Sequence, residues 1–556
     1  MSIDRRLFLG GAAALAVPTA ARAVINAPGA TPAQSRAIAA IAAYLEAHRA
    51  WFALPPMGMV VVDGPFTAIV QSGTSDYREA TPLGGQELWQ IGSISKSFVA
   101  LICLQLETEG KLDLEADIRS ILPEAPLPDD GAFTLRGLLD HTTGLPDFAP
   151  SFYPDGGKLW RGFAPGTHWS YSNTGYNLIG KAIERIEGKP LAVVIEARIT
   201  RPLGMADTRG AITWRDRARY PASYSALRPD IAVRQRNALA PAAWVDASLG
   251  AGSVASTLPD MARYLRFLIG AGSGKGAPLI TDAMAKSWLA KPIVQDPKVP
   301  GETYGLSLMH RTDGGRALLH HTGGMVSFSS SFHVDPAAGT GAFASCTIGG
   351  TDYRPRLLTR FAVQAMRLAA VGKPLPVPPS LAPPAIDKPG DLAGIYRNGG
   401  DSVVITAAPA LAISAWGSVQ PLETQAPDTF VTPHPAFEEF PLIFVRDKAG
   451  VVAIDAGARR FVRDGATAPL PATPARIAAR AGHYQSDDPW IGGITLVARG
   501  DQLLANGTDA ITEIGNDVWR AADPAWNPER IGFGGFVAGK PQIVILSGRV
   551  LERRDG

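Results

Sequence analysis

Two proline-rich segments divide the chain and argue against a single continuous core. Residues 371–390 read VGKPLPVPPSLAPPAIDKPG, and residues 465–474 read GATAPLPATP. Proline cannot donate the backbone hydrogen bonds of helices and sheets, and proline-rich runs stay extended, so we interpret both segments as linkers. The sequence therefore predicts three folded units and two linkers: a domain over 24–370, a linker over 371–390, a domain over 391–464, a linker over 465–478 and a domain over 479–556.

The two short units begin and end alike, which indicates an internal repeat. Residues 392–396 (LAGIY) resemble residues 479–484 (ARAGHY), and residues 461–464 (FVRD) resemble residues 551–555 (LERRD). Both units hold short alternating apolar and polar runs between Gly, Asp and Pro clusters, as in antiparallel sheets. We expect two small β-barrels. Neither contains a cluster of chemically reactive side chains, so we expect them to be structural or to shape a substrate site.

The first unit has a different pattern. Long apolar stretches of helical length, at residues 94–109 and 258–270, alternate with strand-like segments at residues 59–62 and 342–348. The hydrophobic fraction of 46% and charged fraction of 19% are typical of a folded protein. We predict a mixed α+β domain and expect the catalytic residues here.

The N-terminus has the parts of an export signal. Arg5 and Arg6 precede a mildly apolar run over residues 7–20, and Ala21-Arg22-Ala23 forms a small-residue cleavage site. The apolar run is shorter than the roughly 20 residues of a membrane-spanning helix. We therefore expect residues 1–23 to engage the twin-arginine export machinery, with cleavage after Ala23 and release into the periplasm without a membrane anchor.

Charge and cysteine content exclude several classes of partner. Lys and Arg together number 53 against 51 Asp and Glu, which leaves no cationic surplus for nucleic acid. The two cysteines, Cys103 and Cys346, give neither a zinc-binding pattern nor a disulfide framework. We expect no metal and no organic cofactor, and the oligomeric state stays open.

A serine and a lysine three residues apart are the first catalytic candidates. Residues 92–96 read GSISK and lead into an apolar helix. Side chains three residues apart share a helix face, about 5–6 Å between β-carbons, so Ser93 and Lys96 can meet. Burial lowers a lysine pKa, which would make Lys96 a general base, and free N–H groups at a helix start can hold an oxyanion. Alone, however, S-x-x-K is short enough to arise by chance.

Two later motifs make this pair specific. Tyr171-Ser172-Asn173 and then His321-Thr322-Gly323-Gly324 follow in order. Together, S-x-x-K, Y-x-N and H-T-G-G resemble the three motifs of the serine β-lactamase and penicillin-binding-protein superfamily. The resemblance covers residues 35–370 and includes LLDHTTGL at residues 138–145. Within this superfamily the chain most resembles the class C-like members. Among these it resembles the D-aminopeptidase-like branch, which has two C-terminal β-barrels.

The resemblance implies an architecture and a mechanism. The expected catalytic domain is an antiparallel sheet flanked by helices, plus a helical subdomain, with the site between them. Ser93 would attack a carbonyl to form an acyl-enzyme, while Lys96 and Tyr171 share the proton transfer.

The same resemblance assigns substrate-binding residues. They are Asn173, His321, Thr322, Gly323 and Gly324. Asn173 would donate to a substrate amide, and the backbone N–H groups of Ser93 and Gly324 would hold the oxyanion. β-Lactamases usually have a lysine at the position of His321. Because a histidine is mostly neutral at pH 7, binding of a substrate carboxylate at this position is less expected. His141 is expected to be a structural hydrogen-bonding residue.

Four functions remain open from the sequence. The leading hypothesis is a periplasmic peptidase or amidase on small peptides with D- or unusual residues, including linearised cyclic peptides such as microcystin. The alternatives are a carboxylesterase, a β-lactamase or DD-carboxypeptidase, and a non-catalytic protein that binds peptidoglycan fragments. Tyr176 and Asn177 are expected only to pack the helix after the Y-x-N motif, and His320 either lines the site or ends a strand.

Overall fold

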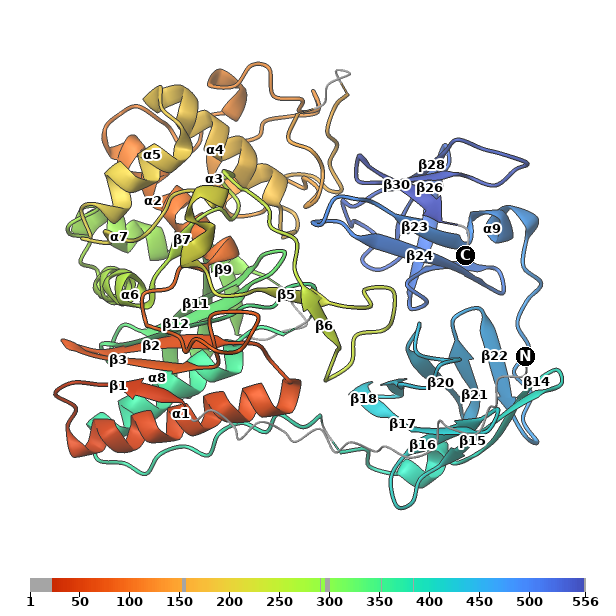
Figure 1. Cartoon of the computed structure of the whole chain (residues 1–556). Coiled ribbons are helices and arrows are strands. Elements are labelled where there is room, and N and C mark those ends of the chain that lie inside the picture. Colours follow the sequence, from red (N-terminus) through yellow and green to blue (C-terminus); the bar gives the residue numbers. More distant parts are fainter. Residues whose placement is uncertain are drawn as a thin grey trace, which may run out of the picture.

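A computed structural model of the chain describes residues 23–152, 157–290, 292–295, 301–351, 353–383 and 385–554. An N-terminal α+β domain lies beside two β-barrels, which confirms the predicted fold class (Figure 1). Residues 1–22 of the predicted export signal lie outside the described residues, so that interpretation stays a prediction. No described helix is both long and apolar enough to cross a bilayer.

A nine-stranded sheet forms the centre of the N-terminal domain. Every pairing in it is antiparallel, in the order β1-β3-β2-β13-β12-β11-β10-β9-β8. The strands are β1 (Val24–Asn26), β2 (Met57–Asp63), β3 (Phe66–Ser72), β8 (Ile293–Val294), β9 (Glu302–Gly305), β10 (Leu308–Asp313), β11 (Arg316–Gly324), β12 (Ser329–Asp335) and β13 (Thr340–Cys346). The H-T-G-G motif forms the end of β11, where Gly324 pairs with Ser329.

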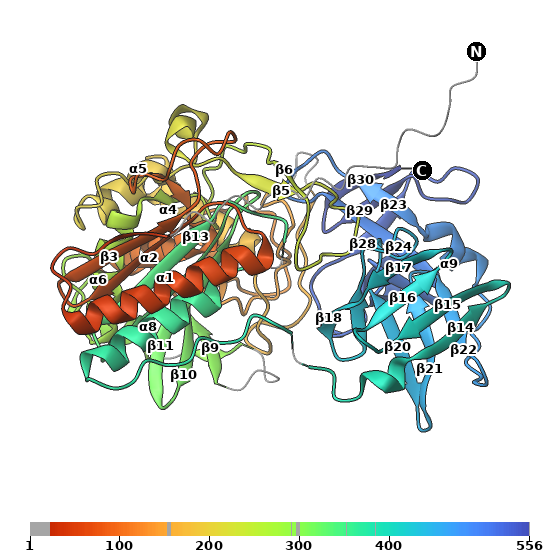
Figure 2. The same ribbon diagram turned by 60° about the horizontal axis from the view of Figure 1, so that its bottom comes forward.

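Helices cover both faces of this sheet (Figure 2). On one face lie α1 (Pro32–Phe52) and α8 (Arg356–Ala370), which pack on each other; α1 begins at a capping box made by Thr31 and Gln34. On the other face, α6 (Leu258–Gly272) packs on β2 and β13, and Thr257 caps its first turn. The strand pair β4 (Trp89–Gln90) and β7 (Ala255–Ser256) connects this layer to a helical subdomain.

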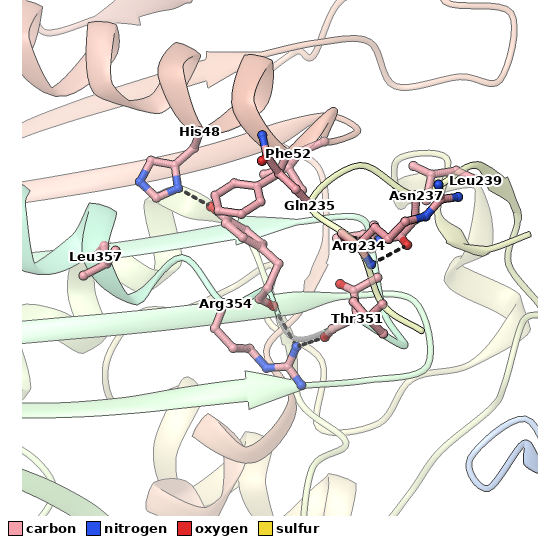
Figure 3. Close-up of a pocket in the computed structure, with 13 residues that line it drawn as sticks. His48, Phe52, Arg234, Gln235, Asn237, Leu239, Thr351, Arg354 and Leu357 are labelled. Carbon is pink, nitrogen blue, oxygen red and sulfur yellow. Dashed lines mark hydrogen bonds between the residues drawn. The ribbon is translucent and has the colours of Figure 1, made fainter. Parts of the chain in front are cut away.

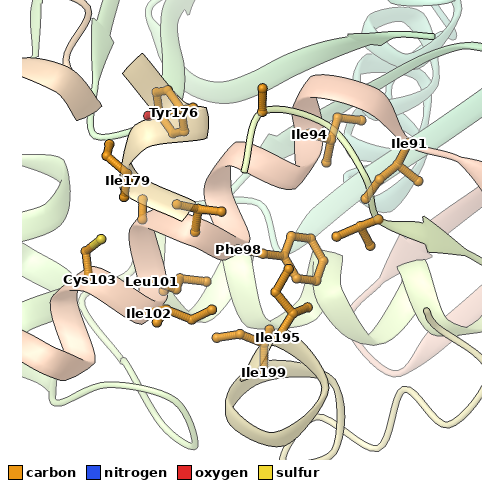
Figure 4. Packing of buried hydrophobic residues seen from close by; sticks show 14 of the residues in the cluster. Ile91, Ile94, Phe98, Leu101, Ile102, Cys103, Tyr176, Ile179, Ile195 and Ile199 are labelled. Atoms are coloured by element: carbon orange, nitrogen blue, oxygen red, sulfur yellow. The ribbon is translucent and has the colours of Figure 1, made fainter. Parts of the chain in front are cut away.

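The helical subdomain surrounds α2 (Ser95–Thr108), which is apolar on nearly every side. This helix packs on α4 (Asn173–Glu187) and α5 (Leu191–Ile195), while α3 (Leu135–Leu139) packs on α4 and α7 (Asp282–Leu289) packs on α6. Phe98, Leu101 and Ile102 of α2 are fully buried (Figure 4). The Phe98 ring stacks on Tyr264 at 4.4 Å between centroids. A helix buried all round is held in place by packing. The N-terminal end of α2 is therefore fixed in space.

Both C-terminal units are antiparallel barrels. The first is nearly closed, because its end strands β17 and β18 are consecutive in the chain; the second is closed, in the order β23 to β30. The first contains β14 (Gly394–Asn398), β15 (Asp401–Thr406), β16 (Ala412–Ala415), β17 (Ser418–Pro421), β18 (Glu423–Ala426), β19 (Thr429–Val431), β20 (Leu442–Asp447), β21 (Gly450–Ala456) and β22 (Arg459–Arg463). The second follows α9 (Ala475–Arg480) and contains β23 (Gly482–Gln485), β24 (Gly493–Arg499), β25 (Gln502–Ala505), β26 (Asp509–Gly515), β27 (Val518–Ala521), β28 (Ile531–Gly534), β29 (Ile543–Leu546) and β30 (Arg549–Arg554).

The repeat seen in the sequence corresponds to a contact between a tyrosine and an arginine that both barrels share. Tyr396 donates its hydroxyl to Leu392 O at 2.7 Å, and Tyr484 donates to Arg480 O at 2.9 Å, four residues back in each case. In the last strand of each barrel an arginine, Arg463 or Arg553, lies over the same tyrosine ring. An equivalent tyrosine and arginine pair thus joins the first strand of each barrel to its last strand.

Both barrels dock on the N-terminal domain. The first contacts the loop between β5 (Tyr224–Ala226) and β6 (Leu239–Pro241), where Gln235 N donates to Glu423 at 3.1 Å. The second contacts residues 147–148 and 160–162: Trp160 Nε1 donates to Pro528 O at 2.7 Å. A Cβ atom on Gly162 would lie 2.4 Å from Trp526 O, so the absence of a side chain at Gly162 permits this approach.

Replacing Gly162 by alanine tests the second docking surface. The added methyl group meets the backbone of residues 526–528, and overpacking of this kind costs about 1–3 kcal/mol. We expect Gly162→Ala to lower the free energy of unfolding in denaturant titrations by that amount. Gly534→Ala is the matched control, because a Cβ there meets no atom within 4 Å. Equal stability of the two variants would contradict the docking contact.

Candidate active site

Ser93 lies in a 3-10 turn over Gly92–Ile94, directly before α2, rather than within the helix as the sequence suggested. Lys96 occupies the first turn of α2, and its Nζ donates to Ser93 Oγ at 3.1 Å. Lys96 is fully buried, whereas Ser93 remains partly accessible. The two candidate residues therefore meet as their spacing predicted, with the serine facing outward and the lysine behind it.

Lys96 binds three separate segments of the chain. Besides Ser93, its Nζ donates to Asn173 Oδ1 at 2.6 Å and to Ala251 O at 2.7 Å. It lies 4.7 Å from the ring centroid of Tyr171. Burial lowers the pKa of the Lys96 ammonium well below its usual range, and the Asp147 carboxylate partly opposes this shift. A lysine in this state can accept the proton of Ser93.

Tyr171 is the second group that reaches the nucleophile. Burial raises the pKa of its hydroxyl far above the usual range, and a hydrogen bond with Ser93 opposes that shift. The hydroxyl therefore stays protonated and can pass a proton onward. The ring of His141 lies 4.3 Å from that of Tyr171, and Ser172 N donates to His141 Nδ1 at 3.1 Å. His141 thus holds the Y-x-N segment in place.

Asp147 is a site residue that the sequence did not single out. Its Oδ1 accepts Asn173 N at 2.7 Å, and its backbone N–H donates to Glu529 of the second barrel. Burial raises the pKa of the Asp147 carboxyl to about 6, while the bond from Asn173 and the nearby Lys96 charge lower it. Asp147 therefore influences the pKa of Lys96 and is held by another domain.

Two glycines bring β11 against the Ser93 turn. A Cβ on Gly323 would lie 1.9 Å from Ile91 O, and a Cβ on Gly92, whose φ is +54°, would lie 2.7 Å from Gly324 N. Ser330 Oγ donates to Ile91 O at 2.9 Å and strengthens the same contact. The backbone of Gly324 therefore reaches the Ser93 turn, as the predicted oxyanion pair requires.

His321 lies behind the cavity wall. It is 1% exposed, its Nδ1 is 2.6 Å from Thr322 O, and its Nε2 is 3.4 Å from the Tyr304 hydroxyl. Burial lowers its pKa to about 3, although the Thr322 carbonyl opposes this, so the ring is neutral at pH 7. Of the third motif, Gly324 lines the cavity around Ser93; His321, Thr322 and Gly323 do not.

The cavity around Ser93 has walls from two domains. The N-terminal domain contributes Ser93, Asn173, Asn177, Leu249 and Met325 among others. Asn177, expected only to pack its helix, lines the cavity and accepts Ala251 N at 3.1 Å through Oδ1. The second barrel contributes three side chains to the same cavity: Trp490, Ile491 and Arg549. No sequence pattern linked these residues to the site.

A separate cavity lies at the C-terminal end of α1 and contains none of the predicted catalytic residues. His48, Phe52, Arg234 and Arg354 are among its lining residues (Figure 3). His320 lines neither of these two cavities; it is buried, and its ring stacks on His333 at 4.8 Å. The chemistry therefore belongs to the cavity around Ser93. Among the described residues, no group of three or more His, Cys, Asp or Glu side chains is placed to hold a metal ion.

The fold and this site define a serine hydrolase. The family profile described as Beta-lactamase matches residues 41–365, more than half of the chain. The chain therefore belongs to the beta-lactamase family, and the resemblance drawn from its three motifs is confirmed.

Individual relatives differ in activity and in how much they cover. The D-alanyl-D-alanine-carboxypeptidase/endopeptidase AmpH of Escherichia coli (strain K12) is 26% identical over 322 residues, 52% of this chain and 79% of AmpH. A penicillin-binding protein of Bacillus subtilis (strain 168) is 34% identical over 154 residues, but these cover 25% of this chain and 34% of that protein. Esterase EstB of Burkholderia gladioli is 33% identical over 163 residues, covering 24% and 41%.

One solved structure extends into the C-terminal region. The octameric penicillin-binding protein homologue from Pyrococcus abyssi covers 77% of this chain and 100% of its own, with a TM-score of 0.54 and 19% identity. At this identity the similarity concerns the fold alone.

Replacing Asp147 by asparagine tests its influence on Lys96. The carboxylate stabilises the charged lysine and so raises its pKa; the isosteric amide keeps an acceptor for Asn173 N but removes the charge. We therefore expect the limb of the kcat/KM profile that rises with pH to move to lower pH. Asp260→Asn, a buried acid in α6, is the control and should leave the limb in place. A limb that stays or moves to higher pH in Asp147→Asn would refute the coupling.

Proposed function

We propose that this enzyme hydrolyses small peptides or amides with D- or unusual residues through an acyl-enzyme on Ser93. Lys96, assisted by Tyr171, takes the proton from Ser93 Oγ as Oγ attacks the scissile carbonyl. The N–H groups of Ser93 and Gly324 stabilise the oxyanion. The C–N bond then breaks, and the leaving amine receives the proton through Tyr171 and Lys96.

Deacylation reverses the proton path. A water molecule gives its proton to the same pair and attacks the ester carbonyl, and Ser93 Oγ recovers the proton as the carboxylic acid leaves. Asn173 contributes to binding: its Oδ1 accepts Lys96 Nζ, and its Nδ2 group, which also bonds the Asp147 carboxylate, has a second N–H for a substrate carbonyl.

The observation that carries this proposal is the contribution of the second barrel to the cavity. Trp490, Ile491 and Arg549 line it together with Ser93, so the cleft is bounded on a side where a larger substrate would continue. A bounded cleft favours short substrates. The buried, neutral His321 also does not supply the cation that a lysine at this position of β11 would offer to a carboxylate-bearing penicillin.

A carboxylesterase is the second candidate. The cavity is lined by Phe148, Leu249, Met325 and Ile491, an apolar set that suits simple acyl chains. The relative EstB is named an esterase, which supports the same reading. A purely binding function is less supported, because the Lys96 to Ser93 contact is in place.

A substrate panel tests the reaction and separates the candidates. We expect a fluorophosphonate probe to label the wild type and to leave Ser93→Ala unlabelled, because only the serine oxygen can attack phosphorus. Turnover of D-Ala-p-nitroanilide should be Ser93-dependent, and nitrocefin turnover should be at least tenfold slower. Ester turnover alone, measured with p-nitrophenyl butyrate, would favour the esterase. Equal labelling of Ser93→Ala would overturn the nucleophile.

We also propose that the chain is exported by the twin-arginine machinery and cleaved after Ala23. Arg5 and Arg6 with the Ala21-Arg22-Ala23 site support this address. Replacing both Arg5 and Arg6 by lysine should leave uncleaved chain in the cytoplasm, as followed by cell fractionation and N-terminal sequencing. Unchanged processing and delivery of the double variant would argue against this route.

A further inference from the structure

The cavity around Ser93 contains a cation on an unexpected wall. Among its described lining residues, Arg549 is the one basic side chain and Asp147 the one acidic side chain. Lys96 is fully buried behind Ser93, and His321 on the β11 side is neutral. Among the described residues that line the cavity, Arg549, at the start of β30 in the second barrel, is therefore the one that offers a carboxylate a positive charge.

The Arg549 guanidinium is fixed from two sides. Its Nε donates to Phe148 O of the N-terminal domain at 2.7 Å, and its Nη1 donates to Asp488 Oδ2 at 3.0 Å. Asp488 is itself held, since its Oδ1 accepts Trp490 N at 3.0 Å. The side chain is 37% exposed, and Nη2 has no hydrogen-bond partner among the described residues. A pre-oriented guanidinium with one free arm is suited to bind a carboxylate.

The position of Arg549 indicates which half of the substrate it meets. Arg549, Asn177 and Leu249 line the cavity around Ser93 and also line a neighbouring hollow. Asn177 lies one helical turn after Asn173 in α4, whereas Gly324 and Met325 come from β11 and the residue that follows it. Arg549 therefore lies on the Asn173 side of the site, where the acyl half of the substrate would extend.

We propose that Arg549 binds a carboxylate carried by the acyl half of the substrate. The inference rests on the proposed acyl-enzyme function and narrows its substrate class. The acyl donors would be amides or esters of acids with a second, free carboxylate, such as dicarboxylic acids or acidic amino acids of D configuration. The free carboxylate takes no part in bond making; it pairs with Arg549 while Ser93 attacks the other carbonyl.

Two matched fluorophosphonates test this without assuming an amide or ester substrate. One carries a 4-carboxybutyl chain and the other its methyl ester. In both, Ser93 Oγ forms a bond to phosphorus, the P–F bond breaks, fluoride leaves, and the Oγ proton passes to Lys96. We expect the acid to label Ser93 about 10- to 100-fold faster per unit concentration, the range of a charge-assisted hydrogen bond. Arg549→Gln should reduce this ratio to near one.

A second variant changes the ratio in the opposite direction. Asp488→Asn removes the counter-charge beside Arg549 but keeps an acceptor for Trp490 N, so the acid should gain further over the ester. Arg554→Gln, on the same strand but outside the cavity, is the charge-matched control and should leave the ratio unchanged.

The outcomes separate two failures. If neither probe labels Ser93, the proposed function fails and this inference fails with it. If both label but the wild-type ratio is near one, or Arg549→Gln keeps the preference, the hydrolase stands and the carboxylate site is refuted. Thermal melts and methyl ester labelling show whether each variant is folded.

Discussion

The buried amine of Lys96 is the interaction on which the site depends. It satisfies its hydrogen bonds with Ser93, Asn173 and Ala251, which come from the turn before α2, the start of α4 and the loop before β7. A buried polar group without partners costs free energy, so each segment is held where the lysine needs it. The same contacts of Lys96 therefore set the geometry of the site and stabilise this part of the fold, and the apolar packing of α2 supports both.

The sequence predicted what lies close along the chain. Ser93 and Lys96 are three residues apart, and their side chains meet. The internal repeat of the two barrels could be recognised because Tyr396 and Tyr484 each bond a residue only four positions earlier. Contacts between distant segments could not be inferred in this way. The backbone N–H of Asp147 donates to Glu529, which lies 382 positions later in the chain. The sequence around either residue gives no indication that these two segments pack together. The burial of His321 was hidden for the same reason, since it depends on Tyr304 of another strand.

The two barrels show how a repeated fold acquires different roles. Both barrels keep the contact between a tyrosine on the first strand and an arginine on the last strand. The first barrel contacts the loop between β5 and β6, away from Ser93, through Gln235 and Glu423. The second places the residues around Trp490 and Arg549 into the cavity. The framework is shared while the loops and strand ends have diverged, as is usual when function is added to a stable scaffold.

The backbone contact between the Ser93 turn and β11 also limits how such an enzyme can evolve. At Gly92 and Gly323 the nearest atoms are backbone atoms of the facing segment and leave no room for a side chain. Mutation therefore has little freedom to reshape the backbone around the Ser93 turn. Variation in what is recognised must arise on the opposite walls, at side chains such as Phe148, Leu249 and Trp490, which line the cavity and make none of the contacts to Ser93 or Lys96 described above.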